Sequence, residues 1–89
     1  MFDELQSSPH RNIPGGTQWR GDFPNGYGIS VVTGDHEFFY TDPEHPYEVA
    51  VILHGGICYT TPITDDVLGR QTEADVLRVI EQIKALPAA

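Results

Sequence analysis

The sequence is short of cysteine, of basic side chains and of long apolar runs, and each shortage excludes a class of protein. Cys58 is the single cysteine, so no disulfide closes within the chain and this residue is expected to be a small buried apolar side chain. Five Lys and Arg against 13 Asp and Glu give a formal net charge of -8, which leaves too few cations to bind DNA or RNA phosphates directly. No apolar run approaches the roughly 20 residues that span a bilayer, so we expect no membrane insertion.

Motifs for catalysis and cofactor binding are also missing. The pair Gly26 and Gly28 precedes a strand pattern rather than a helix, and no Lys-Ser or Lys-Thr follows a glycine run, so neither a dinucleotide site nor a phosphate loop is predicted. No serine lies in a nucleophile elbow. His36, His45 and His54 recur regularly, but their spacing fits no compact metal-binding motif. The sequence therefore predicts a non-enzymatic protein with no metal and no cofactor.

The N-terminal quarter differs in character from the rest. Residues 1–22 mix Ser, Pro and Gly with polar residues and show no sustained periodicity, which predicts an extended or disordered arm. Trp19 is expected to pack back on the domain, as a lone tryptophan usually does. The first residues carry no basic segment followed by an apolar one, so a cytoplasmic location is expected. Residues 23–89 are predicted to form a single α+β domain, because a chain of 89 residues suits one small core.

Alternating apolar residues predict the strands. The alternation is regular over residues 27–33 and again over 47–53, and a shorter aromatic run covers 36–40. The prolines between 41 and 46 predict an exposed acidic loop. A Gly-Gly pair at 55 and 56 predicts a hairpin into a strand over 57–60.

Two capping patterns follow the strands. Thr64 is predicted to cap a short helical turn through Leu68, ended by Gly69, with one of the two carboxylates at 65 and 66 serving as a structural cap. Thr72 and Asp75 predict the start of a C-terminal helix whose apolar stripe faces the sheet and which Pro87 stops. The predicted fold is α+β: an antiparallel meander of three to four strands packed against one C-terminal helix, with an extended N-terminal arm.

Three segments together resemble a group of small proteins encoded by tailed bacteriophages. These segments are Asn25-Gly26-Tyr27-Gly28, Tyr47-Glu48-Val49-Ala50-Val51, and the run from Cys58 through Thr61-Pro62-Ile63-Thr64-Asp65-Asp66-Val67-Leu68-Gly69. The resemblance covers residues 23–86 and is interrupted by residues 35–46. It implies a phage origin and a role in the host cytoplasm during infection, and it transfers no catalytic residue.

Acidity and the phage resemblance together favour a protein that binds and inhibits or modulates a host macromolecule with a basic surface, for example an anti-defence protein such as an anti-CRISPR. An acidic surface can imitate a nucleic-acid backbone, although acidity also serves solubility. The residues expected to contact the partner are acids of the predicted loop, strand and turn, with Tyr40 or Tyr47 as an aromatic anchor. The acids are Asp42, Glu44, Glu48, Asp65 and Asp66.

Two alternatives stay open at this stage. An oligomer could sequester a nucleotide immune signal between subunits, with phosphates held and bases stacked by Arg20, Arg70, Arg78, Trp19 and Tyr27. The chain could instead be a virion-associated structural protein that pairs through an exposed strand edge. The sequence leaves the partner and the oligomeric state undetermined.

Overall fold

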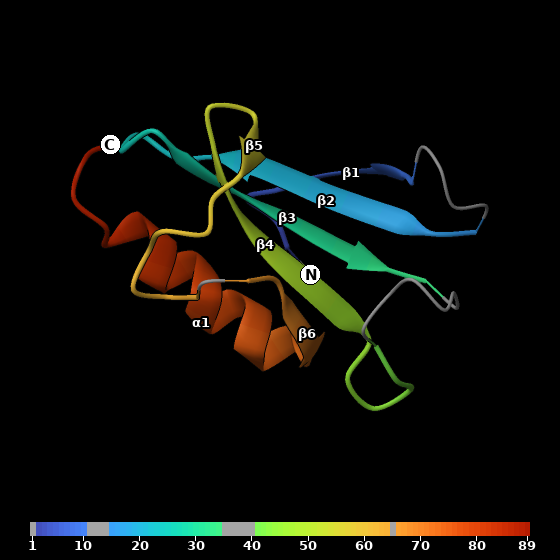
Figure 1. Ribbon diagram of the computed structural model, residues 1–89. Helices are drawn as coiled ribbons and strands as arrows, with labels where there is room; N and C mark the ends of the chain where they lie inside the picture. The colour runs from blue at the N-terminus through green and yellow to red at the C-terminus, as the bar shows by residue number, and fades with distance from the viewer. Residues whose placement is uncertain (1, 11–14, 35–40, 65) are drawn as a thin grey trace.

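The computed structural model describes residues 2–10, 15–34, 41–64 and 66–89 as one six-stranded antiparallel sheet and one helix (Figure 1). The order of strands across the sheet is β1-β2-β3-β4-β5, in which β5 pairs with the end of β4, and β6 pairs with the first half of β4. The predicted α+β class with a C-terminal helix is confirmed, but the sheet has more strands than the three to four expected. In chain order the elements are β1 Gln6–Pro9, β2 Thr17–Asp22, β3 Tyr27–Thr33, β4 Tyr47–Leu53, β5 Gly56–Ile57, β6 Leu68–Gln71 and α1 Glu73–Lys84.

The N-terminal segment belongs to the sheet instead of forming a separate arm. It is extended, as predicted, but β2 pairs with β3 along its whole length and β1 pairs with β2. Phe2 and Leu5 are buried in the core at 4 % and 8 % exposure. All four residues of β1 are exposed, so the strand carries no apolar alternation that could have revealed it in the sequence.

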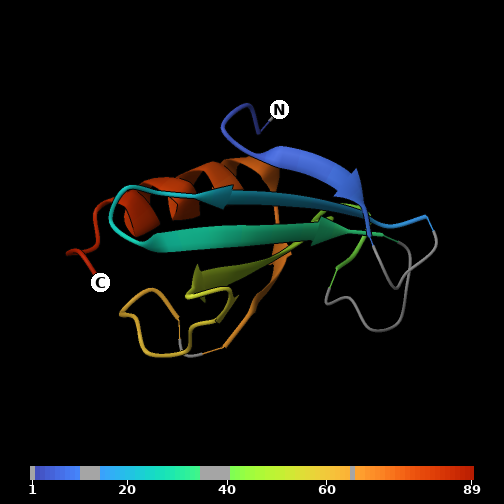
Figure 2. The same ribbon diagram turned by 90° about the horizontal axis from the view of Figure 1, so that it is seen from above.

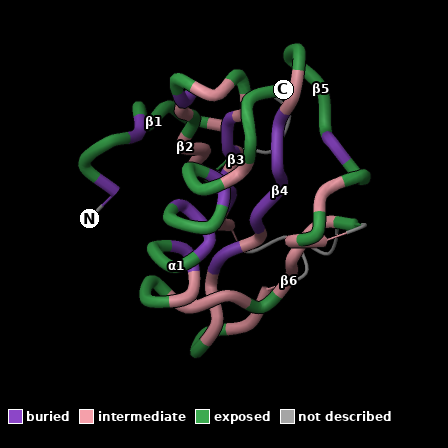
Figure 3. The backbone as a smooth tube through the Cα atoms, turned by 90° about the vertical axis from the view of Figure 1, so that its left-hand side faces the viewer, coloured by how far each residue is buried: buried purple, intermediate pink, exposed green. Residues whose placement is uncertain are grey.

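The centre of the fold is the pair β3 and β4, whose bounds agree with the predicted strands. Ile29 lies opposite Val51, and Val31 lies opposite Val49, and all four are almost fully buried. The helix α1 runs along this face of the sheet (Figure 2). Buried residues gather on β3, β4 and the side of α1 turned towards them (Figure 3). The helix contributes Val76, Val79, Ile80 and Ile83 to the core.

The start of α1 is the capping box that the sequence predicts. The backbone N–H of Asp75 donates to the Thr72 hydroxyl at 3.2 Å, and the backbone N–H of Thr72 donates to the Asp75 carboxylate at 2.9 Å. Two of the N–H groups at the helix N-terminus are thereby satisfied. No helix within the described ranges is long and apolar enough to cross a membrane.

The predicted hairpin after β4 is present, with a two-residue turn. His54 and Gly55 both have positive φ, at 54° and 79°, which is the backbone of a primed turn that matches the twist of the strands. The following strand is shorter than predicted, because β5 ends at Ile57. Cys58 is buried at 7 % exposure, as expected of a lone cysteine.

The segment after residue 64 corrects one prediction. The hydroxyl of Thr64 does accept the backbone N–H of Asp66 at 3.1 Å, but no helical turn follows, because Leu68 already begins β6. Leu68 pairs with Val49, and Gln71 pairs with Tyr47. Between these two pairs β6 has one residue more than β4, so β6 forms a bulge. Asp65 and the strand expected over 36–40 lie outside the described residues.

Candidate functional site

The Asn25 turn, one of the segments behind the phage resemblance, holds the fold together. The Asn25 side-chain amide donates to the carbonyl of Ile83 at 2.8 Å and to that of Leu86 at 3.1 Å, and these two bonds tie the turn to the C-terminal end of α1. Its side-chain oxygen accepts the backbone N–H of Tyr27 at 3.1 Å. A Cβ on Gly28 would lie 2.6 Å from the carbonyl oxygen of Gly21. This segment therefore has an architectural role.

Of the two expected aromatic anchors, the one that the structure describes, Tyr47, lies in the interior. Tyr47 is only 7 % exposed and packs edge to face against Phe2 and Trp19, with ring centroids 5.1 Å and 5.8 Å apart. Burial, followed by the nearby charge of Glu73, raises the pKa of Tyr47. Tyr47 is thus corrected from surface anchor to core residue, because it shares the face of β4 that carries Val49. Tyr40 lies outside the described residues.

A rigid acidic turn connects to the start of β4. One carboxylate oxygen of Asp42 accepts the backbone N–H of Glu44 at 3.0 Å and that of His45 at 2.8 Å, together with His45 Nδ1 at 2.9 Å. The side-chain bond from His45 is the largest cause that lowers the pKa of Asp42. Asp42 and His45 also exchange both backbone hydrogen bonds. The turn therefore holds the backbone of the exposed residue Glu44 in place.

Arg70 joins this turn to β6. Its Nε lies 3.8 Å from the second carboxylate oxygen of Asp42, and its side chain remains 69 % exposed. The backbone of Arg70 is left-handed, with φ 51°, a conformation that costs an L residue about 1–2 kcal/mol. Bulges re-aim side chains, and this one carries Arg70 to Asp42. Sequence reasoning did not find this contact, although the Asp-Pro-Glu-His spacing is itself a turn signal.

We call the group Asp42, Glu44, Glu48 and Asp66 the acidic corner. Asp66 and Arg70 line a common hollow of about 320 Å³, and Arg70 contacts Asp42, so these elements meet at one end of the sheet. Glu48 follows Tyr47 on β4 and lies opposite Val32, on the face turned away from α1. Asp65, the remaining acid expected to contact a partner, is not described. Arg70 therefore links the Asp42 turn, which carries Glu44, to the hollow beside Asp66, and Glu48 lies near the start of the β4 strand that follows this turn.

Three of the four basic side chains in the described ranges, Arg70, Arg78 and Lys84, pair with acids of the same chain. Arg78 Nη1 donates to Asp75 at 2.9 Å, and Lys84 Nζ donates to Glu4 at 2.7 Å. The Glu4 bond, with a smaller contribution from Glu81, raises the pKa of Lys84. With Arg70 beside Asp42, three cations are compensated by the protein's own acids, so the remaining exposed acids set the sign of the surface field.

The residues expected to hold a nucleotide do not form a single site. Arg20 lies opposite Ser30, one residue from Trp19 and therefore on the other face of the sheet from α1, which carries Arg78. Trp19 and Tyr27 pack against the core, so their rings are engaged there. This arrangement gives the phosphate-holding and base-stacking groups no common centre within one subunit.

Neither metal nor thiol chemistry gains support. In the described ranges no three His, Cys, Asp or Glu residues gather closely enough to hold a metal ion. Cys58 Sγ lies 3.4 Å from the hydroxyl of Thr60, and that contact lowers the pKa of the thiol. A buried thiol bonded to a hydroxyl still lacks an adjacent base.

The β1 edge offers little to a pairing strand. The backbone N–H of His10 donates to Gly16 at 2.8 Å, and antiparallel alternation then turns the backbone groups of Ser7 and Pro9 outward. Pro9 has no N–H, and the N–H of Leu5 is bonded to the Phe2 carbonyl at 2.9 Å. Along β1 the backbone N–H of Ser7 is then the one donor that points outward. Pro9 therefore limits the pairing of another strand with this edge.

The chain is thus a small α+β domain in which one sheet, one helix and an acidic corner are the defining features. Comparisons with protein-family models, with curated proteins and with solved structures find no match. The acidic corner is the candidate functional site, because Glu44 is exposed on a turn held by hydrogen bonds and Asp66 is exposed beside Arg70, which contacts this turn.

Proposed function

We propose that this protein is a non-enzymatic binding protein of a tailed bacteriophage that acts in the host cytoplasm. It binds a host protein with a basic surface and inhibits or modulates it, as an anti-defence or host-takeover protein does. The observation that supports this most directly is the acidic corner, where Asp42 is bonded into a rigid turn beside the exposed Glu44. The compensation of Arg70, Arg78 and Lys84 by internal acids adds to it.

Electrostatic steering is the expected mechanism. A surface with one dominant sign of charge accelerates encounter with an oppositely charged partner, and salt screens this attraction over a Debye length of about 8 Å at physiological ionic strength. The fixed turn reduces the conformational entropy lost when the partner binds. The protein occupies the partner's basic surface and so keeps its nucleic acid or other acidic ligand away.

The test is affinity capture of the tagged protein's partner from bacterial lysate, followed by binding measurements with the recovered partner. The variant Glu44→Gln/Asp66→Asn removes two charges from the acidic corner, and Asp22→Asn/Glu81→Gln removes two exposed charges elsewhere. At low salt we expect the first variant to weaken binding about tenfold, which is about 1.4 kcal/mol, and the second to change it less than about threefold.

Salt dependence supplies the second readout. Raising the salt to about 0.5 M shortens the Debye length to about 4 Å and should weaken the complex strongly. An affinity that is unchanged by this salt, or a control variant that loses as much as the corner variant, contradicts the proposal.

A further inference from the structure

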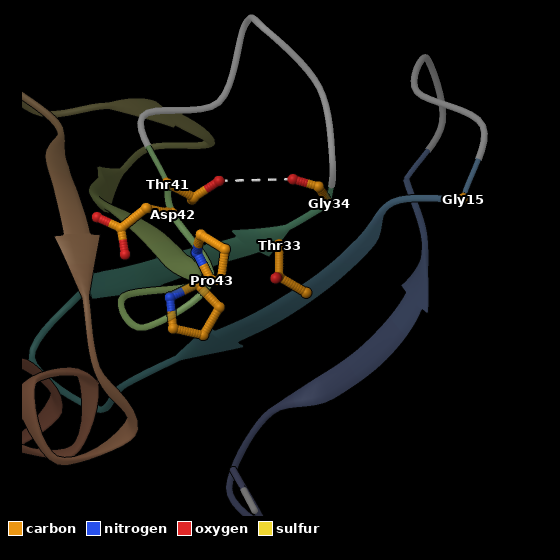
Figure 4. A pocket seen from close by; sticks show the side chains of 7 residues that line it. Gly15, Thr33, Gly34, Thr41, Asp42 and Pro43 are labelled. Carbon is orange, nitrogen blue, oxygen red and sulfur yellow. Dashed lines mark hydrogen bonds between the residues drawn. The ribbon is translucent and has the colours of Figure 1, made fainter.

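A second hollow lies beside the acidic corner, between the end of β3 and the start of β4 (Figure 4). Its volume is about 480 Å³, and Gly15 on the approach to β2 closes one side. This volume lies within the roughly 300–1,000 Å³ of ligand pockets. The remaining lining residues are Thr33, Gly34, Thr41, Asp42, Pro43 and Pro46.

The lining combines hydrogen-bond acceptors with flat apolar rings. The Thr41 hydroxyl donates to the carbonyl of Gly34 at 3.5 Å, so its own lone pairs remain for a donor that enters the pocket. The side chain of Thr33 points into the space beside the proline rings, whereas the Asp42 carboxylate is turned towards β6 (Figure 4). None of the described residues that line the hollow is Lys, Arg or His.

These groups favour a cation with an apolar stem. Among the described lining side chains, an anion would find the Thr33 hydroxyl as a donor, since the Thr41 hydroxyl donates to Gly34, and it would meet the negative field of Asp42 and Glu44. A guanidinium has five N–H donors in one plane, is weakly hydrated and stacks on flat surfaces, so it suits spread neutral acceptors beside proline rings. A lysine ammonium keeps its hydration shell more strongly and has no flat face.

We propose that this pocket receives an arginine side chain of the partner protein. The inference rests on the proposed function, since it names the group by which a basic partner is held. The acidic corner attracts the partner, and the pocket then binds one guanidinium through Thr33, Thr41 and the carbonyl of Gly34. Specificity for arginine over lysine comes from the pocket, because the field of the corner does not distinguish them.

The first test uses a small molecule and requires no partner. N-acetyl-arginine methylamide is titrated into the ¹⁵N-labelled protein, with the lysine and citrulline analogues as matched probes. We expect saturable shifts at the amides of Thr33, Gly34 and Thr41, at least fivefold weaker binding of the lysine analogue, and no binding of neutral citrulline. Equal binding of citrulline, or shifts spread over all acidic surfaces, overturns the proposal.

Variants separate the pocket from the general charge. Thr33→Val and Thr41→Val each remove one hydroxyl while keeping the branched shape, and each should weaken arginine binding about 3- to 10-fold. Thr60→Val makes the same change beyond β5 and should have no effect. Arginine affinity unchanged in both pocket variants rejects the assignment.

The recovered partner distinguishes this proposal from the one it rests on. If the partner depends on salt and on Glu44 and Asp66 but is insensitive to Thr33→Val and Thr41→Val, the pocket assignment fails while the proposed function stands. If the arginine probe binds the pocket but no partner shows sensitivity to the acidic corner, the proposed function fails while the pocket site stands.

Discussion

Replacing Asn25 by aspartate tests whether the Asn25 turn is architectural. The substitution Asn25→Asp keeps the size of the side chain but replaces an amide that donates to the carbonyls of Ile83 and Leu86. Two lost hydrogen bonds cost about 1–3 kcal/mol. A negative charge at a helix C-terminus adds about 0.3–1 kcal/mol. We therefore expect the free energy of unfolding to fall by about 1.5–4 kcal/mol.

Urea denaturation followed by Trp19 fluorescence measures this loss at pH 7. In a domain of this size 1 kcal/mol corresponds to about 4–8 °C in Tm, so thermal unfolding should shift by at least about 6 °C. Gln18→Glu is the matched control, because it adds the same charge on the face turned away from α1. Gln18 Nε2 donates to the Ser30 hydroxyl at 2.9 Å, and the new carboxylate can accept from that hydroxyl instead. It should cost at most about 1 kcal/mol.

The effect of Asn25→Asp should also depend on pH. Carbonyl oxygens and the helix C-terminus raise the folded-state pKa of the new carboxyl above its unfolded value of about 3.9. The added destabilisation is then complete above the folded pKa and disappears as the pH falls below the unfolded value. A cost below about 0.5 kcal/mol at pH 7, or one equal to that of Gln18→Glu, would refute the assigned role of Asn25.

Three further predictions concern the core, the sheet and the helix cap. Phe2→Ala should lower the free energy of unfolding by about 3–5 kcal/mol, since Phe2 is buried against Trp19; an unchanged urea midpoint would mean that the N-terminal segment is a detached arm. Gly28→Ala should destabilise by at least about 1–3 kcal/mol, because its Cβ would lie 2.6 Å from a carbonyl oxygen, whereas Gly56→Ala, which meets no atom within 4 Å, should be near neutral in the same assay. The pKa of Asp75 is held below its ordinary value, first by the backbone N–H of Thr72, so its stabilisation is present above the unfolded pKa and is lost as the pH falls through the folded one. The stability difference between wild type and Asp75→Asn should accordingly shrink between pH 7 and pH 2, and a pH-independent difference would contradict this.

The elements that the sequence predicts well have a periodic apolar pattern and, in the helix, a capping signal. Strands β3 and β4 alternate, and α1 has both a stripe and the Thr72 capping box. Strand β6 was missed because its four residues include Gly69 and a bulged Arg70, which is the composition of a turn. Its pairing depends on the register with Tyr47 and Val49, and a register between distant segments is not visible in either segment alone.

The part of the candidate site that depends on local composition could be predicted from the sequence, and the part that depends on strand pairing could not. The acids of the turn were identified because proline and acid composition mark an exposed loop. The link from Asp42 to Arg70 spans two strands that meet only in the folded sheet, so no local pattern indicates it. Tyr47 could have been placed correctly, since the alternation already put it on the face of Val49 and Val51, where an aromatic ring is buried.

The segments that carry the phage resemblance lie in the structural part of the fold. Asn25 ties the C-terminal end of α1 to the turn between β2 and β3. Val49 and Val51 fill the core, and Leu68 pairs with Val49. Segments with such roles are constrained by packing whatever the protein binds, so a resemblance carried by them implies a fold and no activity. The segment that does not share the resemblance, residues 35–46, includes the Asp42 turn and both prolines of the pocket. A surface loop on a rigid sheet can change its partner without loss of the core, and the binding specificity of this protein is therefore expected to reside there.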